Sequence, residues 1–177
     1  MLDSLITSKT RVKLLLKFFL NSRSKSYLRN LASEFDESTN AIRLELNRFE
    51  EAGMLKSDNS GNKKIYQANT DHPLFDDIHR IILKHVGLDR IIETVIEKLG
   101  DIEKVFLTGQ FAKGIDNHII DLIFIGDKVN REFLLKLIEK AEQKIKRKIK
   151  YIIYSAGDFE KFRETYKETE LLLLWKK

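Results

Sequence analysis

The stretch "LTGQFAKGIDNHIIDLIFIGD", residues 107–127, decides the fold of the carboxy-terminal half of the chain. It starts at the end of one apolar run, passes through Gly109 and a segment long enough for a short helix, and continues as the apolar run "IIDLIFIG" of residues 119–126. An apolar run of that kind is typical of a central strand that is buried on both faces. The stretch therefore predicts the order strand, glycine turn, short helix, strand.

The sequence on either side extends this pattern. Apolar spacing predicts a strand at residues 102–109, before the turn. After Gly126, amphipathic or apolar spacing predicts a helix at residues 131–146, a strand at 148–155, a helix at 156–168 and a last strand at 171–175. Alternation of this kind gives an α/β sandwich around a small mixed sheet.

Two helices are predicted between residues 70 and 100. Phe75, Ile78 and Ile82 form an apolar stripe on the first, and Gly87 separates it from the second. The stripe of the second helix has two interpretations, a dimer interface or a cover for the sheet of the following domain. His72, His79 and His85 do not share metal-ligand spacing, so they are predicted to be surface or interface residues.

The first seventy residues predict three helices and a β-hairpin. Apolar residues at helical spacing begin at Val12, Leu28 and Ile42, with Ser8 or Thr7 as the cap of the first helix and residues 36–38 as a turn before the third. Residues 21–26 are predicted to form a loop. Gly53 ends the third helix, and Gly61 lies at the tip of a hairpin formed by residues 54–57 and 64–68.

The pattern "LRNLASEFDESTNAIRLELNRFEEAGML", residues 28–55, resembles the winged helix-turn-helix domain of ArsR-like transcriptional regulators. The resemblance covers about residues 5–70 and implies that the third helix enters the major groove of double-stranded DNA. Side chains that can contact bases or phosphates occupy the matching positions, and they are Ser38, Thr39, Asn40, Arg43, Asn47, Lys63, Lys64 and Arg29.

An alternative interpretation is a winged helix that binds protein rather than DNA. Glu34, Asp36, Glu37 and Glu45 lie close in sequence to the proposed DNA-reading face, and their negative charge opposes DNA binding. Basic and amide residues nevertheless hold the expected positions, so DNA binding is the favoured prediction.

The carboxy-terminal half resembles the minimal nucleotidyltransferase domains. That family has Gly-Ser after the first strand, a short helix with Ala and Gly, and Asp-x-Asp on the next strand, which binds two Mg²⁺ ions. Gly109, Gly114 and Asp121 match the pattern, whereas Gln110 replaces the serine and Ile119 replaces the first aspartate. The strand at residues 148–155 also contains no carboxylate.

One carboxylate is a poor site for Mg²⁺, which needs several oxygen ligands in near-octahedral geometry. The sequence therefore predicts a degenerate domain that is not an enzyme, with no catalytic or metal-binding residues and no cofactor. Gly109, Gln110, Gly114 and Asp121 are predicted to be the remnant of a nucleotide site. Two alternatives stay open: a divergent Mg-dependent nucleotidyltransferase that uses Asp121 and Asp116, and a non-catalytic module that senses a nucleotide.

Composition agrees with a globular protein that has a polyanionic partner. The chain has 177 residues, no cysteine and a formal net charge of +5. The absence of cysteine excludes disulfides and thiolate metal sites. The apolar run at residues 12–20 is too short to cross a bilayer, so a cytoplasmic protein with no membrane contact is predicted.

The basic cluster "KIKRKIK", residues 144–150, has two interpretations. It could guide DNA or bind phosphate, or it could be a solvated helix end followed by a strand edge that lysines protect from pairing.

These features predict an α/β (α+β) protein in three parts: a DNA-binding winged helix-turn-helix domain at residues 1–70, connecting helices at 71–100, and a nucleotidyltransferase-like domain at 101–177. The predicted function is a sequence-specific transcriptional regulator that acts as a homodimer. The second domain would provide dimerisation, partner binding or ligand sensing, and nucleotide binding is allowed but not required.

Overall fold

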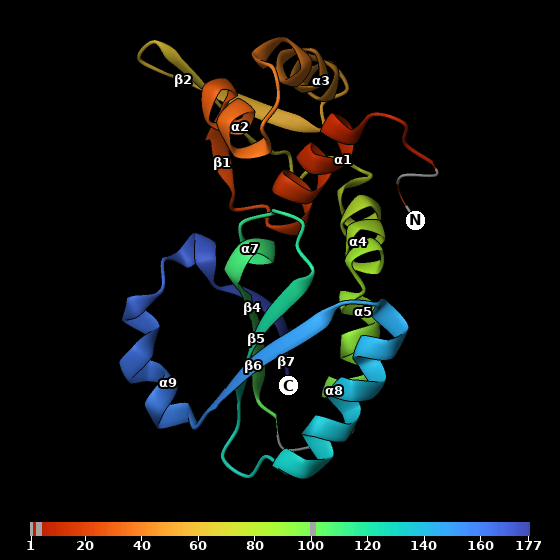
Figure 1. Ribbon diagram of the computed structural model, residues 1–177. Helices are drawn as coiled ribbons and strands as arrows, with labels where there is room; N and C mark the ends of the chain where they lie inside the picture. Colours follow the sequence, from red (N-terminus) through yellow and green to blue (C-terminus); the bar gives the residue numbers. More distant parts are fainter. Residues whose placement is uncertain (1, 3–4, 100–101) are drawn as a thin grey trace. The chain divides into compact units, whose positions relative to one another are not determined.

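The computed structural model describes Leu2, residues 5–99 and residues 102–177, and the chain forms two compact units (Figure 1). The first unit comprises residues 1–82 and the second residues 83–177. The division falls inside helix α4 (Phe75–Val86), so the segment predicted to connect two domains is shared between the units. The predicted boundary between residues 100 and 101 lies outside the described residues.

Three helical segments form the body of the first unit, as the apolar spacing predicted. They are α1 (Lys9–Leu15), which continues as the π-helix η2 (Leu16–Leu20), α2 (Leu28–Phe35) and α3 (Thr39–Glu51). The predicted capping residue Ser8 accepts a hydrogen bond from the Arg11 backbone N–H. The core of this unit contains Phe18, Phe19, Leu31, Ile42 and Leu46, all fully buried.

A three-stranded antiparallel sheet completes the first unit. Its order is β1 (Lys25–Tyr27), β3 (Lys63–Ala68), β2 (Leu55–Ser60), and β2 and β3 form the predicted hairpin. Gly53 and Gly61 have φ values of 71° and 59°, which explains glycine at the helix end and the hairpin tip. Strand β1 corrects the prediction of a loop at residues 21–26, because Lys25 and Ser26 pair with β3.

The part of α4 within the first unit packs through its aromatic residues. The rings of Phe19 and Phe75 lie 5.7 Å apart, and His79 stacks on Phe75. Nδ1 of His79 lies 2.6 Å from the Phe19 carbonyl oxygen. His79 is half-buried and therefore packs within the first unit through its ring and one ring nitrogen.

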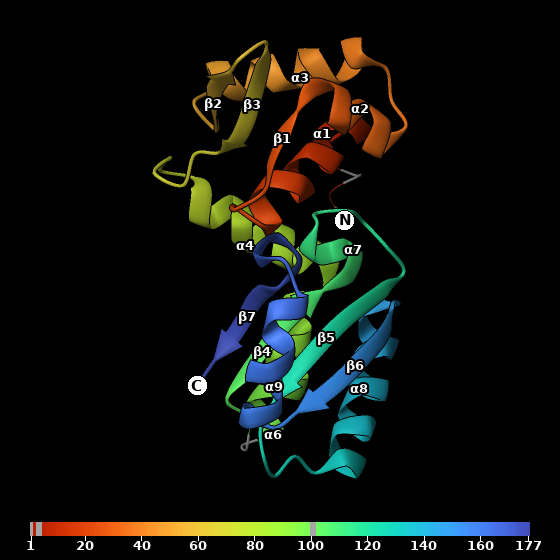
Figure 2. The same ribbon diagram turned by 90° about the vertical axis from the view of Figure 1, so that its left-hand side faces the viewer.

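The second unit is a four-stranded mixed sheet between two layers of helices (Figures 1 and 2). The sheet order is β6-β5-β4-β7, in which β4 is antiparallel to both β5 and β7, whereas β5 and β6 are parallel. Helix α9 lies on one face, and α5 and α8 lie on the other. The strands are β4 (Lys104–Thr108), β5 (Ile119–Ile125), β6 (Lys148–Tyr154) and β7 (Leu172–Lys176).

The helical segments of this unit are α5 (Leu88–Ile91), the π-helix η3 (Ile92–Ile96), α6 (Glu97–Leu99), α7 (Gly109–Ala112), α8 (Arg131–Ile145), α9 (Ala156–Phe162) and the 3-10 turns η4 (Arg163–Thr165) and η5 (Glu168–Glu170). Within the described residues, no helix combines the length and the apolar character that a membrane crossing needs.

The apolar stripe after Gly87 is part of the core of this unit. Ile91 and Val95 are fully buried within a single chain, which favours the sheet cover over the dimer interface. Gly87 has a φ of 92°, and a Cβ atom there would lie 2.8 Å from Cγ2 of Ile145. Glycine therefore allows the start of α5 to approach the end of α8 closely.

The two faces of the sheet follow the alternation along β5. Ile123 and Ile125 pack with Phe159 of α9 and with Leu171, while Ile120, Leu122 and Phe124 point to the opposite face. The predicted order of strands and helices and the α/β (α+β) class are confirmed.

Candidate functional site

Helix α3 presents a polar face that is held in place by an apolar one. Ile42 and Leu46 are fully buried and Phe49 is nearly so, and they anchor the helix in the core. The predicted contact residues on the other side, Ser38, Thr39, Asn40, Arg43 and Asn47, are all exposed. Within each set the residues recur every three or four positions and share a face, and the two sets are offset by one residue, which places them on different faces of the helix.

A cavity of about 540 Å³ lies between α2, α3 and the β2–β3 hairpin in the first unit. Five of the eight predicted DNA-contacting residues line it, and they come from separate elements: Arg29, Arg43, Asn47, Lys63 and Lys64. The remaining lining residues are Tyr27, Leu28, Asn62 and Tyr66. The fold thus gathers most of the predicted cationic and amide groups at one hollow.

The other three predicted residues, at the start of α3, lie outside this cavity. The Ser38 Oγ accepts a hydrogen bond from the Ala41 backbone N–H at 3.2 Å, so it acts as the N-cap of α3. Asn40 Oδ1 accepts from Arg43 Nη1 at 3.1 Å, which orients the guanidinium along the exposed face.

The hairpin lysines are held at the rim of the cavity by neighbouring side chains. The Lys63 ammonium lies 4.7 Å from the centre of the Tyr27 ring. Lys64 Nζ lies 2.6 Å from Glu50 Oε2, and this hydrogen bond raises the pKa of Lys64 above its ordinary value. Lys64 is therefore partly neutralised by Glu50, whereas the Lys63 charge rests against an aromatic ring.

Three of the four acidic residues that opposed DNA binding are paired with basic residues of the first helical segment. Glu45 Oε2 lies 2.8 Å from Arg11 Nε, Glu37 binds Lys13 at 2.8 Å, and Glu34 binds Lys17 at 2.8 Å. None of these carboxylates lines the cavity. Their charge is thus largely compensated on the side of α2 and α3 that contacts α1 and η2.

Glu45 is the most buried of these acids, with only 6% of its side chain exposed. Burial raises its pKa most strongly, but hydrogen bonds from Arg11 and Ser8 and the charges of Arg11 and Arg48 outweigh that effect and leave a lowered pKa. The carboxylate therefore stays ionised and ties α3 to α1.

In the second unit, the glycine turn lies against Asp121. Gly109 has a φ of 67°, and a Cβ atom there would lie 2.3 Å from Asp121 Oδ2. Thr108 and Asp121 are paired in the β4–β5 ladder. The predicted residues Gly109, Asp121 and the exposed Gln110 are therefore close together, and Gly114 follows with a φ of 75°.

A cavity of about 470 Å³ opens on the sheet beside this turn. Its polar lining residues come from four elements or loops, and they are Thr108, Asp121, Lys150, Tyr151 and Tyr166. Its apolar lining residues are Leu122, Ile123, Ile149 and Ile152. Lys150 and Asp121 are register partners in the parallel β5–β6 ladder, so a cation and a carboxylate share this surface.

The residues do not fit the two-ion magnesium arrangement of the family. Ile119 supplies no ligand, and the other nearby acid, Asp116, forms an ion pair with Arg147 at 2.8 Å. Within residues 5–99 and 102–177, no group of three or more His, Asp or Glu side chains could hold a metal ion. Asp121 is then a single carboxylate with cationic and hydroxyl neighbours.

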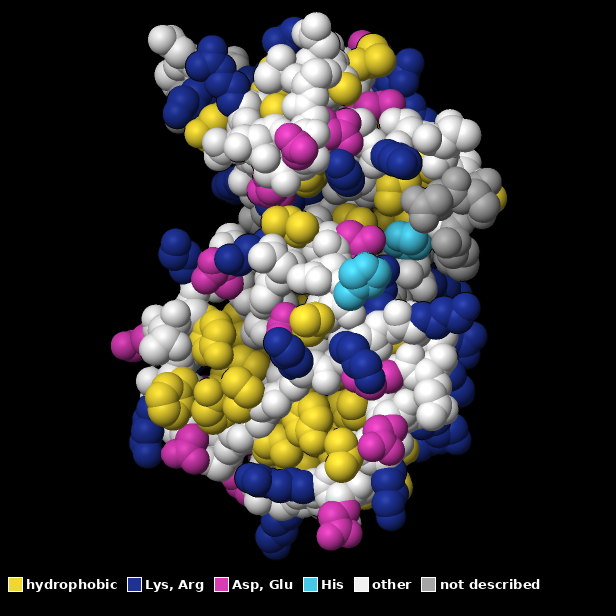
Figure 3. Space-filling view, in the orientation of Figure 1, with side chains coloured by type: hydrophobic (Ala, Val, Ile, Leu, Met, Phe, Trp, Pro, Cys, Tyr) yellow, Lys and Arg dark blue, Asp and Glu magenta, His cyan; other side chains and the backbone are white. Residues whose placement is uncertain are grey.

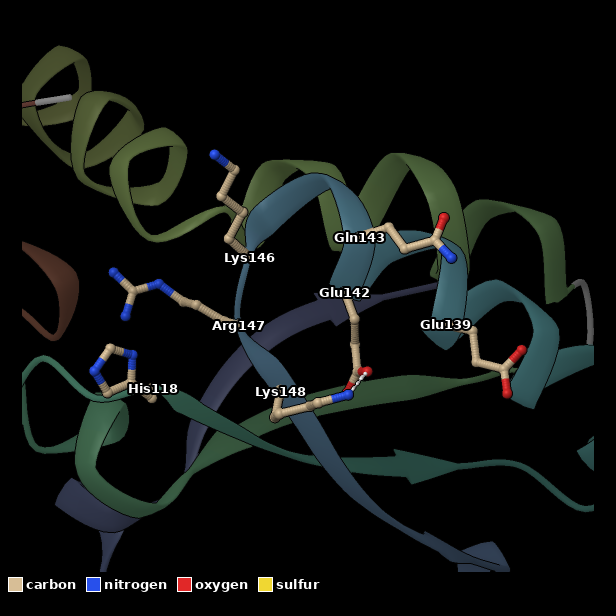
Figure 4. A pocket seen from close by; sticks show the side chains of 7 residues that line it. All are labelled: His118, Glu139, Glu142, Gln143, Lys146, Arg147 and Lys148. Carbon is tan, nitrogen blue, oxygen red and sulfur yellow. Dashed lines mark hydrogen bonds and ion pairs between the residues drawn. The ribbon is translucent and has the colours of Figure 1, made fainter.

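A third cavity, of about 520 Å³, is lined in part by Lys146, Arg147 and Lys148 of the basic cluster, for which a guide for DNA or phosphate was one of the two interpretations (Figure 4). Arg147 donates to Asp116 and to the Asn117 carbonyl oxygen, and its guanidinium carbon lies 5.1 Å from the centre of the Phe111 ring. Lys148 pairs with Glu142 at 2.7 Å. Arg147 and Lys148 thus form local ion pairs, which counts against their acting as a guide for DNA or phosphate.

Comparison with known proteins gives a likeness in structure only. No family model matches the sequence, and no curated protein matches it. One similar solved structure is described as a "putative nucleotidyltransferase" from Sulfolobus solfataricus, at 23% identity and a TM-score of 0.36, covering 54% of this chain and 80% of that one. Another is AF1382 from Archaeoglobus fulgidus, at 20% identity and a TM-score of 0.38, covering 52% of this chain and 98% of that one.

In the second unit, a glycine turn follows the first strand of the sheet and Asp121 lies on the next strand, as the sequence predicted. The prediction that the chain is not an enzyme is contradicted by the description of the first of these similar structures as a "putative nucleotidyltransferase". The missing carboxylates remain a fact of the sequence, but they do not exclude an enzyme.

Proposed function

We propose that the first unit binds double-stranded DNA in a sequence-specific manner and that the chain regulates transcription. The observation that carries this proposal is the cavity lined by Arg29, Arg43, Asn47, Lys63 and Lys64. Clustered cationic and amide side chains beside one exposed helix face are the electrostatic footprint of a nucleic-acid-binding surface.

Different elements of the first unit would contact the bases and the phosphates of the DNA. Helix α3 would enter the major groove, where Arg43 makes bidentate bonds to a guanine and Asn47 to an adenine. Lys63 on the hairpin and Arg29 on α2 would contact phosphates, which gives affinity and position but no sequence information. Ser38 is already engaged as the N-cap, so it would contribute through the start of the helix rather than through base contacts.

A homodimer suits this mode of binding, because two copies related by a two-fold axis read two half-sites of a palindromic operator. DNA binding should then show strong salt dependence, since every phosphate contact releases counterions.

A second candidate function concerns the second unit and rests on the cavity beside Gly109. Lys150 and Thr108, which line this cavity, offer a cation and a hydroxyl that suit a phosphate group. We propose that a nucleotide binds there. A nucleotide that binds the DNA-bound and free states unequally would change DNA affinity by the same factor as DNA changes nucleotide affinity.

Three measurements test these proposals separately. Fluorescence anisotropy with a duplex recovered from bound genomic fragments tests DNA binding, with Arg43→Ala as the specificity variant and Lys63→Ala as the general-affinity variant. Calorimetric titration with each NTP tests the cavity, with Lys150→Ala as the binding variant and Lys161→Ala, an exposed lysine of α9, as the matched control. Incubation with labelled NTP and Mg²⁺ shows whether the bound nucleotide is transferred.

A further inference from the structure

Strand β6 leaves one edge of the sheet open. Within the described part of the chain, it is the outermost strand in the order β6-β5-β4-β7 and pairs only with β5. The Lys148 N–H donates to the His118 carbonyl, and the Tyr154 carbonyl accepts from Gly126, so even-numbered residues turn their backbone groups toward β5. Successive residues of an edge strand direct their backbone N–H and C=O groups to opposite sides. Ile149, Tyr151 and Ile153 therefore direct these groups away from β5.

The outward N–H of Ile149 is hydrogen-bonded to a side chain, whereas the outward N–H groups of Tyr151 and Ile153 are not. Glu142 Oε1 accepts from the Ile149 N–H at 2.7 Å. Its Oε2 pairs with Lys148 Nζ at 2.7 Å, as Figure 4 shows. Among the described residues, no hydrogen bond reaches the N–H of Tyr151 or Ile153. Glu142 therefore sets one end of a short open edge.

The opposite edge of the sheet is less suited to pairing. Strand β7 has five residues, and its register with β4 shifts between Val105 and Phe106. Bulges of this kind twist an edge away from further pairing. Strand β6 has seven residues in unbroken register with β5 and contains no proline.

Apolar side chains flank the open edge. Ile152 of β6 is 49% exposed, and Phe162 of α9 is 47% exposed with its ring 5.4 Å from that of Tyr154. Strand β6 crosses in front of the other strands in Figure 1, and Figure 3 shows hydrophobic side chains gathered on this side of the unit. An open strand edge with exposed apolar neighbours is a template for pairing with another chain.

We propose that the occupant of this edge is a second copy of the same chain, paired antiparallel with β6 about Tyr151. In that register Tyr151 of each copy exchanges N–H and C=O bonds with the other, and Ile153 N–H donates to the second copy's Ile149 carbonyl. Lys150 faces the second copy's Ile152, and Lys148 faces the second copy's Tyr154. The sequence is self-complementary here, because no lysine lies directly opposite a lysine and the alkyl stems cover apolar side chains.

The proposal deepens the dimer part of the proposed function, but its test contains no DNA. Sedimentation equilibrium of the full chain should give twice the single-chain mass of 20.8 kDa. Ile152→Lys places a like charge opposite the second copy's Lys150 twice per dimer, and should raise the dissociation constant about tenfold or more. Leu173→Lys on β7 is the matched control, since Leu173 is 48% exposed on the other edge, and it should leave the mass unchanged.

A backbone variant tests the edge itself. Ile153→Pro removes an outward N–H without removing a bond to β5, and edge strands accept proline at such positions, so the variant should fold and yet sediment as a single chain. Circular dichroism melting confirms the fold. Three outcomes overturn the proposal: a wild-type chain at single-chain mass, an Ile152→Lys variant as dimeric as wild type, or equal loss of dimer in Leu173→Lys. None of them bears on DNA reading by α3.

Discussion

The contact between Gly109 and Asp121 makes a quantitative prediction for Gly109→Ala. Alanine at a φ of 67° enters the left-handed region, which costs about 1–2 kcal/mol. Its Cβ would also lie 2.3 Å from Asp121 Oδ2, so the carboxylate must leave its rotamer at a further cost of about 0.5–1.5 kcal/mol. The lower entropy of the unfolded alanine chain offsets about 0.4–1 kcal/mol. We expect a net loss of about 2 kcal/mol in the free energy of unfolding.

The single tryptophan makes this loss measurable in the second unit alone. Trp175 lies on β7, so urea unfolding followed by its fluorescence reports on this unit. Gly157→Ala is the control, because Gly157 lies in α9 with no atom within 4 Å of an added Cβ and should gain about 0.5–1 kcal/mol. Combining Gly109→Ala with Asp121→Ala should recover about 1 kcal/mol relative to the sum of the single changes. A Gly109→Ala variant as stable as wild type would refute the reasoning.

Three further predictions concern other residues. Arg43→Ala should cost about 1–3 kcal/mol on the preferred duplex and relax its specificity, whereas Lys63→Ala should weaken all duplexes alike and lower the salt slope by about one, as anisotropy would show. Because the pKa of Glu45 is lowered, its contribution to stability is fully present above the ordinary value of 4.5 and is lost as the pH falls below that value. Glu45→Gln should therefore flatten the pH dependence of urea unfolding below pH 4.5, and an unchanged curve would contradict this. Arg147→Lys should lower the melting temperature as Arg147→Ala does, because lysine cannot both bind Asp116 and stack on Phe111.

Much of the architecture could be predicted from the sequence because it depends on local periodicity. The buried run at residues 119–126, the glycine at 109 and the caps at Ser8 and Ser38 each have one dominant physical interpretation. Strand β1 could not be predicted in the same way, since three residues carry no recognisable period and the strand exists only through its pairing with β3. The same limit hid the π-turn at η2, which interrupts an otherwise regular apolar stripe.

The candidate sites were predictable in residue type but not in arrangement. The composition of α3 indicated Arg43 and Asn47, but only the fold shows that Arg29 and Lys63 meet them at one cavity. Glu45 counted against DNA binding in the sequence, and its pairing with Arg11 depends on two residues that are 34 positions apart. Long-range pairs of this kind leave no signal in a single sequence.

The most direct test of the central claim is recovery and sequencing of genomic fragments bound by the purified full chain at moderate salt. The account predicts enrichment of one short, roughly palindromic site, and loss of that enrichment in the Arg43→Ala variant. Uniform recovery of fragments, or the same enriched site with Arg43→Ala, would contradict sequence reading by α3.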